Sequence, residues 1–214
     1  MKKIYKNVSI GKNANIGESV IIGCPPQGKK DGDLKTVIGD NCTVRSGTIL
    51  YAGNTIGNNF CTGHNTVIRE ENKIGNDVSI GTLTCVEHHV EIKDGVRIHS
   101  QAFVPEYSIL EEASWIGPNV VFTNALHPQC PKVKKCLKGP HVKRGAKIGA
   151  NSTLLPYIVI GEGALIGAGS VVVRDIPKEK VACGNPARII KKTNELKCKQ
   201  GLTVKPYGQN ERKK

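Results

Sequence analysis

Aliphatic side chains recur at every sixth position over most of the chain, in a series that covers positions 4–22, 38–122 and 142–172. Of its 25 positions, 24 are apolar, and Thr62 is the exception. A period of six fits neither the 3.6-residue repeat of a helix nor the alternation of an ordinary strand. It indicates short strands that each turn one aliphatic side chain inward.

Tight corners are expected between these strands. The residue after the series position is Gly in 12 of the 25 cases, as in "IGNN", "IGND" and "IGAN". Gly and Asn tolerate left-handed backbone, so we expect them to supply it at the corners. Three hexapeptides would close a triangular coil of 18 residues, with strands stacked about 4.8 Å apart. The pattern predicts an all-β fold, a parallel β-helix of about eight triangular coils and roughly 40 Å.

Two interruptions break the series. Ten extra residues follow position 22 and 14 follow position 122, which defines insertions over residues 23–37 and 123–141. The first, polar and rich in Pro and Gly, is expected to be a surface loop. The second is expected to carry function, because a loop that leaves a rigid scaffold is free to do so. We predict one β-helix domain over residues 1–190, then a basic, partly helical tail over residues 191–214.

Composition and charge narrow the classes of function. The net charge is +13, yet residues 1–112 sum to −1, while residues 113–161 hold seven Lys or Arg and no acid. Aromatic residues make up only 4% of the chain, which argues against a nucleic-acid surface and leaves a small polyphosphate ligand. The eight Cys are scattered singly, and no apolar run is long enough for a membrane span. These features indicate free thiols, a cytoplasmic location and no membrane partner.

Three segments carry a family resemblance. The repeat and the closing segment "IGAGSVVVRDIPKEKVACGNPARII" resemble the hexapeptide-repeat acyltransferases over residues 4 to about 190. "GPNVVFTN" and "VKRGAKIGANSTLLP" are similar to members that N-acetylate nucleotide-linked amino sugars. The resemblance implies a left-handed β-helix, a homotrimer, and acetyl-CoA as donor, bound in the groove between neighbouring prisms.

The resemblance also implies catalytic residues in the second insertion. "FTNALHP" looks like a segment of sugar O-acetyltransferases in which the His is the general base. Carried over, His127 would be the base, and Asn124 would contact the substrate or orient that His. An imidazole titrates in the range that removing a proton from a nucleophile requires. In the amino-sugar group another residue can replace the His, and the substrate amine can attack directly, so both routes stay open.

Carried over in the same way, the cofactor residues lie mostly in the closing segment. Small residues would let the pantetheine arm of CoA lie against the backbone, and basic ones would meet its phosphates. The set implied by the resemblance is Lys143, Arg144, Gly167, Ala168, Gly169, Arg174, Asn185, Pro186 and Arg188. The glycines would also serve as corner residues of the fold, whether or not they contact CoA.

Substrate contacts are expected on outward positions of the coils before the second insertion. The candidates are Glu87, His88, Asp94, His99 and Glu112. Asp94 and His99 could accept or relay a proton from a sugar amine. The alternative is that these side chains are only solvated.

A structural zinc site is a competing role for the insertion. Cys130, Cys136 and Cys198 together with His127 would form a four-ligand set. The spacing between the first two is not that of a standard zinc knuckle, so free thiols are the preferred interpretation and no metal is favoured. The chain also lacks the H-x4-H pair of the γ-class carbonic anhydrases.

The interpretation that joins these observations is a CoA-dependent acyltransferase. We expect it to N-acetylate a nucleotide-linked 3- or 4-amino-deoxy sugar for surface polysaccharide. The alternatives are a sugar O-acetyltransferase with a His base, and a non-catalytic or metal-binding β-helix trimer.

Overall fold

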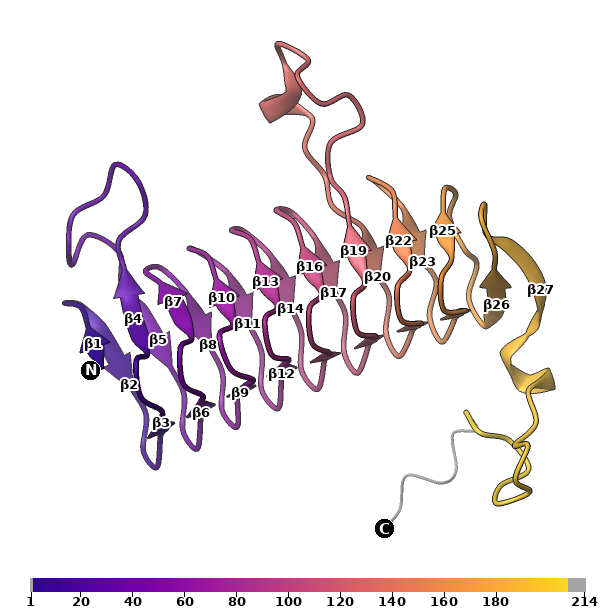
Figure 1. Cartoon of the computed structure of the whole chain (residues 1–214), viewed down its shortest axis with the longest axis horizontal. Helices are drawn as coiled ribbons and strands as arrows, with labels where there is room; N and C mark the ends of the chain where they lie inside the picture. The colour runs from indigo at the N-terminus through magenta and orange to yellow at the C-terminus, as the bar shows by residue number, and fades with distance from the viewer. Residues whose placement is uncertain (1, 208–214) are drawn as a thin grey trace.

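The computed structural model describes residues 2–207 as an elongated three-sided prism (Figure 1). Short strands wind around it in parallel coils, and this is the left-handed parallel β-helix that the six-residue period and the family resemblance predict. Among the described residues, no helix is long and apolar enough to cross a membrane.

The strands form three sheets, which we name A, B and C. Sheet A contains β1 (Lys3–Ile4), β4 (Ile21–Cys24), β7 (Ile49–Tyr51), β10 (Val67–Ile68), β13 (Cys85–Val86), β16 (Phe103–Val104), β19 (Val121–Phe122), β22 (Thr153–Leu154) and β25 (Val171–Val172). Sheet B contains β2 (Val8–Ile10), β5 (Thr36–Ile38), β8 (Thr55–Ile56), β11 (Lys73–Ile74), β14 (Glu91–Ile92), β17 (Ile109–Leu110), β20 (His141–Val142) and β23 (Val159–Ile160).

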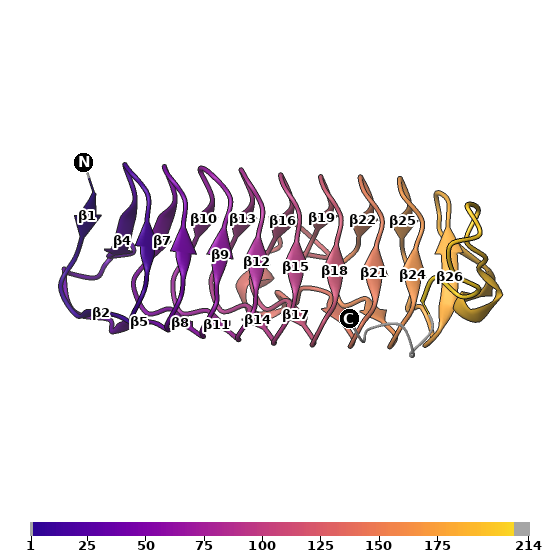
Figure 2. The same cartoon turned by 90° about the horizontal axis from the view of Figure 1, so that it is seen from below.

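Sheet C ends differently from the other two. It contains β3 (Asn15–Ile16), β6 (Thr43–Val44), β9 (Cys61–Thr62), β12 (Ser79–Ile80), β15 (Arg97–Ile98), β18 (Trp115–Ile116), β21 (Lys147–Ile148), β24 (Leu165–Ile166), β26 (Lys180–Cys183) and β27 (Arg188–Lys192). The last pair, β26 and β27, is antiparallel. Figure 2 shows the sheet C strands side by side along one face of the prism.

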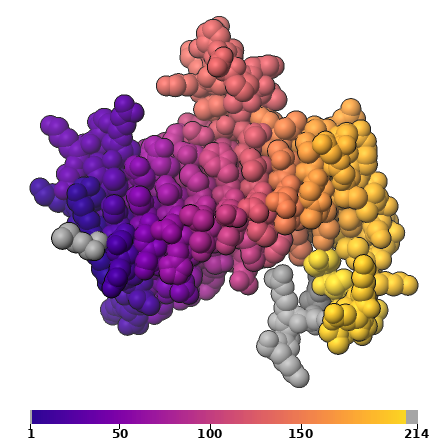
Figure 3. Space-filling model, viewed as in Figure 1, coloured from indigo at the N-terminus to yellow at the C-terminus, as the bar shows by residue number. Residues whose placement is uncertain are grey.

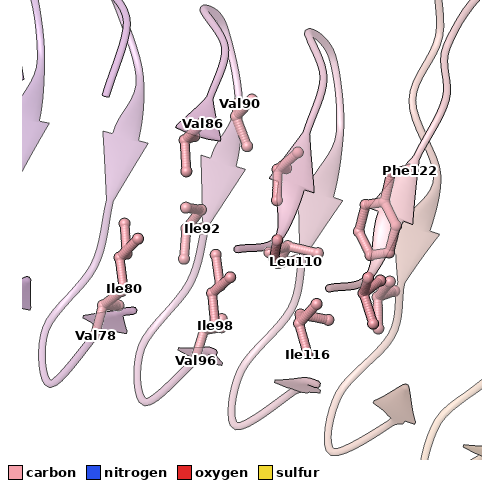
Figure 4. Close-up of a cluster of buried hydrophobic side chains, with 14 of the residues drawn as sticks. Val78, Ile80, Val86, Val90, Ile92, Val96, Ile98, Leu110, Ile116 and Phe122 are labelled. Atoms are coloured by element: carbon pink, nitrogen blue, oxygen red, sulfur yellow. The ribbon is translucent and has the colours of Figure 1, made fainter. Parts of the chain in front are cut away.

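The interior is filled by the series positions. In register, Ile38 pairs with Ile56 and Ile56 with Ile74, so each aliphatic side chain lies above its counterpart one coil earlier. Figure 4 shows the resulting cluster around Ile92, Ile98 and Phe122. Thr62 is also buried, because its hydroxyl accepts from the Arg45 backbone N–H (3.0 Å) and lies 3.2 Å from the Thr48 hydroxyl.

The first coil departs from this rule. Ile4 is 52% exposed, and Ile10 and Ile16 are only half-buried, because no coil covers their N-terminal side. The expectation that every series position is core is therefore wrong at this end.

The corner glycines serve a purpose that the sequence did not predict. As predicted, Asn and Gly supply much of the left-handed corner backbone, but three residues after the series position, as at Asn59 (φ 56°), Asn151 (φ 57°) and Gly95 (φ 68°); of the described glycines that directly follow a series position, Gly23 (φ 78°) alone adopts it. A Gly directly after the series position is needed for close approach between coils. A Cβ on Gly57 would lie 2.7 Å from the carbonyl carbon of Gly75 in the next coil.

Both insertions leave the same edge of the prism, the corner between sheets A and B (Figure 1). The second holds one short 3-10 helix, η1 (Val133–Lys135). After the last coil the expected tail boundary at residue 190 falls inside β27, and the only helix in the described tail is η2 (Thr193–Glu195). Residues 208–214 of the predicted tail lie outside the described residues.

Candidate functional site

A row of polar side chains follows the A–B corner through consecutive coils and ends at the start of the second insertion. It consists of Glu70, His88, Glu106 and Asn124, each two residues after a series position of sheet A and 18 residues from the next. Because consecutive coils stack in register, this spacing places the four side chains one above another. We call this set the polar column.

Direct contacts join three members of the polar column. The Asn124 amide Nδ2 donates to Glu106 Oε2 (2.7 Å), and Glu106 Oε1 lies 3.5 Å from His88 Nε2. The side chains of His88 and Glu106 are 27% and 24% exposed, so both remain reachable from solvent. A carboxylate beside an imidazole orients the ring and stabilises its protonated form, which is the arrangement of a general base.

The neighbouring corner residues hold His88 from the other side. His88 Nδ1 and His89 Nδ1 are 2.8 Å apart, so one nitrogen donates and the other accepts. His89 Nε2 lies 3.7 Å from Glu71 Oε2, and the Tyr107 ring is 6.1 Å from the His88 ring. The imidazole is thus fixed on two sides within one chain.

The lower end of the polar column is anionic and firmly held. Arg69 binds Glu70 through two hydrogen bonds, of 2.8 and 2.9 Å, and reaches Glu87 at 3.3 Å. Burial raises the pKa of Glu70, but the hydrogen bonds and charge of Arg69, a backbone hydrogen bond and the nearby His88 together outweigh it and hold that pKa below its usual value. Glu70 therefore stays ionised near His88.

Two hydrogen bonds hold the insertion, one to its own first residues and one to the following coil. The Lys138 N–H donates to the Asn124 carbonyl (2.9 Å), and the Tyr157 hydroxyl of the following coil donates to the Cys136 carbonyl. The His127 side chain is exposed in the insertion, and the described residues give its ring no hydrogen bond or ion pair. The two predicted catalytic residues thus occupy different surroundings, and only Asn124 joins the polar column.

A hollow of about 620 Å³ lies on the outer surface of sheet C, away from the polar side chains described above. The predicted cofactor residues Gly167 and Ala168 line it together with Arg97, Trp115, Lys147 and Tyr207. Ser114, which is 1% exposed, also lines it, and its hydroxyl has no hydrogen-bond partner among residues 2–207. Small residues, an indole and the Lys147 ammonium suit a pantetheine arm with a phosphorylated end, so these residues fit CoA.

The other predicted cofactor residues lie elsewhere. Arg174 is on the A–B corner, Asn185 and Pro186 are exposed in the turn between β26 and β27, and Arg188 is exposed at the start of β27. Arg144 Nη2 lies 3.5 Å from Glu112 Oε2, on the corner between sheets B and C. The predicted set is therefore spread over several edges of one chain.

Lys143 is engaged by an acid. Its Nζ donates to Glu111 Oε1 (2.9 Å), and the same oxygen lies 2.7 Å from His141 Nε2. Burial raises the pKa of Glu111, but the hydrogen bonds from Lys143, the Arg144 N–H and His141 outweigh it and lower that pKa. The charge on Lys143 is thus largely compensated within the chain.

The predicted substrate residues are not all brought together. Glu87 and His88 share the A–B corner, Asp94 and Glu112 lie on the B–C corner, and His99 lies beside sheet C. Asp94 Oδ1 accepts from the Asn76 backbone N–H (2.7 Å), which fixes a corner between coils. His99 packs its ring against Trp115 at 4.6 Å.

The cysteines of the zinc alternative do not form a cluster. All eight cysteines are free thiols, and among the described residues no group of three or more His, Cys, Asp or Glu could hold a metal ion. Cys130 and Cys136 lie in the insertion, where the Cys136 thiol donates to the Val133 carbonyl (3.3 Å), and Cys198 lies in the tail.

Glu106 was missed by the sequence interpretation. A signal was present, because residues 88, 106 and 124 are His, Glu and Asn at a spacing of one coil, directly below the insertion. Arg97 and Trp115 were missed too, since outward strand positions carry no periodic signal.

Comparison with known proteins supports the family resemblance. Residues 139–174 match the family model described as bacterial transferase hexapeptide (six repeats), which confirms the resemblance predicted from the repeat. The Francisella novicida UDP-N-acetylglucosamine acyltransferase shares the fold, with a TM-score of 0.61, 18% identity, and coverage of 90% of this chain and 71% of that chain. LpxA from Acinetobacter baumannii does so with a TM-score of 0.55, 20% identity, and coverage of 87% and 73%.

Sequence relatives match over shorter segments. The chain is 62% identical over 48 residues to the dTDP-3-amino-3,6-dideoxy-alpha-D-galactopyranose 3-N-acetyltransferase of Aneurinibacillus thermoaerophilus, which is 22% of this chain and 25% of that protein. It is 37% identical over 83 residues to the galactoside O-acetyltransferase of Lactococcus lactis, which is 37% of this chain and 40% of that protein. The chain thus spans well under half the length of these relatives.

Proposed function

We propose that the protein is a CoA-dependent acetyltransferase that acylates the amine of a nucleotide-linked 3- or 4-amino-deoxy sugar used for surface polysaccharide. The similarity to an N-acetyltransferase of a dTDP-linked amino sugar supports both the reaction and the acceptor class. Acetyl-CoA is the proposed donor. Because acetyl-CoA is available in the cytoplasm, the reaction is proposed to take place there.

The observation that carries the proposal is the contact of His88 with Glu106 and of Glu106 with Asn124, at the foot of the insertion. In the proposed step the amine nitrogen attacks the thioester carbonyl carbon, a C–N bond forms, and the C–S bond breaks. His88 Nδ1, released from its contact with His89 Nδ1, takes the proton that the amine nitrogen loses while Nε2 stays beside Glu106, and the proton then passes to the departing CoA thiolate. The products are the N-acetyl sugar and CoA thiol.

A homotrimer is part of the proposal, because one chain holds the two halves of the site apart. His88 stands on the A–B corner, whereas Gly167 and Ala168 line the hollow on sheet C. Contact between face A of one copy and face C of the next is heterologous and can close into a ring. Each site would then take its base from one copy and its donor groove from another.

The competing function is O-acetylation of a sugar hydroxyl with His127 as the base. The similarity to a galactoside O-acetyltransferase favours it. A non-catalytic trimer is the third outcome that the experiment below distinguishes.

Turnover with acetyl-CoA, followed as thiol release, tests these possibilities with dTDP-, UDP- and GDP-linked amino sugars and with galactosides. We expect one amine to be acetylated and His88→Ala to lower kcat by about 10²–10⁴-fold. Glu106→Gln should give a smaller loss, and His127→Ala and the surface control Lys73→Ala should stay within about threefold. Turnover only on hydroxyls with loss in His127→Ala would establish the competing function, and no turnover with no CoA binding would establish the non-catalytic one.

A further inference from the structure

Three hollows adjoin one another along sheet C. The hollow of about 620 Å³ shares Arg97 with a second of about 240 Å³, and the second shares Arg45 with a third of about 130 Å³. We call the second and third hollows the lower groove. It lies toward the first coils, on the face that Figure 2 shows.

The lower groove carries positive charge that no neighbouring carboxylate neutralises. The outward strand positions along sheet C from Asn15 to Leu165 carry no carboxylate. Within the part of the chain that the structure describes, the guanidinium groups of Arg45 and Arg97 form no ion pair, and neither do those of Arg174 and Arg188, whereas Arg69 and Arg144 both do. A solvated protein surface usually intersperses both signs of charge, so two exposed arginines over an acid-free floor suit an anion.

The floor between the two arginines is low and polar. Gly63 and Gly81 line it, and a Cβ on Gly63 would lie 2.2 Å from the Thr82 backbone nitrogen. Thr82 and Ser100 line the same hollow. Glycine is thus enforced here by coil stacking, and the absence of side chains leaves the floor open.

The separation of the arginines fits a short, doubly charged group. Arg45 directly follows β6, and Arg97 lies in β15, three coils further along the sheet. Three coil steps are about 14 Å, which two long side chains can bridge around a diphosphate. Arginine is suited to such a group, because its planar fork binds phosphate oxygens in pairs.

We propose that Arg45 and Arg97 bind the diphosphate of the acceptor, so that the enzyme selects a nucleotide-linked sugar over a free glycoside. This inference rests on the proposed function for the identity of the acceptor. A neutral galactoside would leave both guanidinium groups unused. CoA also carries a diphosphate, but its predicted contacts Gly167 and Ala168 line the hollow of about 620 Å³, which lies beyond Arg97 and away from Arg45.

Binding of dTDP, UDP and GDP to the full-length protein, measured by calorimetry without any acyl donor, tests the inference. We expect Arg45→Gln/Arg97→Gln to weaken the best nucleotide by about 30–100-fold and to flatten the salt dependence of its affinity. The matched control Lys73→Gln, on the outer face of sheet B, should change it less than twofold. Arg45→Lys/Arg97→Lys should retain part of the affinity, since charge remains.

Three results would overturn the inference. They are unchanged nucleotide affinity in the double Gln variant, a loss of CoA affinity in place of nucleotide affinity, and a lower molar mass by light scattering, which would make the arginines interface residues. Arginine-dependent nucleotide binding without acetyl transfer would reject the proposed function and leave the diphosphate site standing. If both arginine substitutions leave acetylation of a nucleotide-linked sugar unchanged, the diphosphate site is rejected and the proposed function stands.

Discussion

At the scale of the residue, each position of the hexapeptide has a separate task. The series position faces inward, and the residue after it must allow the following coil to approach. The residue three positions after the series position adopts left-handed backbone, even where it is Leu83 or Tyr107. The position two residues after the series is free to carry chemistry. His88, Glu106 and Asn124 all occupy it, which is why the fold can align them without disturbing the core.

Thiol reactivity should follow the position of each cysteine. Burial, followed by the charge of Glu87, raises the pKa of Cys85 to about 11, whereas backbone N–H groups of Gln200, Leu202 and Thr203 lower the pKa of Cys198. Because the thiolate is the reactive form, iodoacetamide at pH 8 should modify Cys198 at least about tenfold faster than Cys85. Mass spectrometry of timed digests measures both rates.

Labelling in urea provides the control for that comparison. Both cysteines should then react at similar rates, because the folded surroundings that separate their pKa values are gone. Equal rates in the native protein would contradict the environment described for Cys85.

At the scale of the element, stability comes from stacking one coil on the next. Gly57→Ala would place a Cβ 2.7 Å from backbone and side-chain atoms of Gly75 and Asn76 in the following coil. We expect it to destabilise the fold by about 1–3 kcal/mol, since the coils would have to separate locally. The midpoint of urea unfolding measures the effect.

Lys93→Ala is the matched control, because Lys93 occupies the equivalent position of another coil and already has a Cβ. It loses only an exposed ion pair with Glu91, worth at most about 1 kcal/mol. Equal midpoints for the two variants would show that the glycine is not required for stacking.

The strands were predictable because their signal is redundant. One inward aliphatic residue per six, repeated in register, fixed the coils and the inner surface of all three sheets, including Ile38, Ile56 and Ile74. The antiparallel pair β26 and β27 was not predicted, since the six-residue period has ended by Lys180. Polar residues were harder to interpret, because a corner that fixes the backbone through Asp94 and a corner that carries a base through His88 look alike in sequence.

At the scale of the whole molecule, the outer surface of sheet A is apolar. Its outward strand residues include Ile49, Val67, Phe103 and Val121, of which Phe103 is 36% and Val121 39% exposed. Figure 3 shows that the second insertion projects from the middle of the prism, clear of the coils on either side. An apolar face beside such a projection is suited to contact with another copy.

Phe103→Lys should therefore dissociate the proposed trimer, because a charge would be buried in the contact between faces A and C. Light scattering should show the molar mass falling to about one third, and acetyl transfer should be lost with it. Thr55→Lys, which places the same charge on the outer face of sheet B, should leave both unchanged. A trimer that persists in Phe103→Lys would assign the contact to another face.

The stacking register also governs how the chain gains its order during folding. Hydrogen-bonded neighbours are 18 residues apart in an uninterrupted coil and 32 apart across the second insertion. Lengthening that closure costs only about 0.5 kcal/mol of chain entropy, because the cost grows with the logarithm of loop length. Each coil contacts only its neighbours, so order can spread from one coil to the next. The prism can therefore assemble from its first coils while the ribosome is still synthesising the rest, with the insertion delaying a single step.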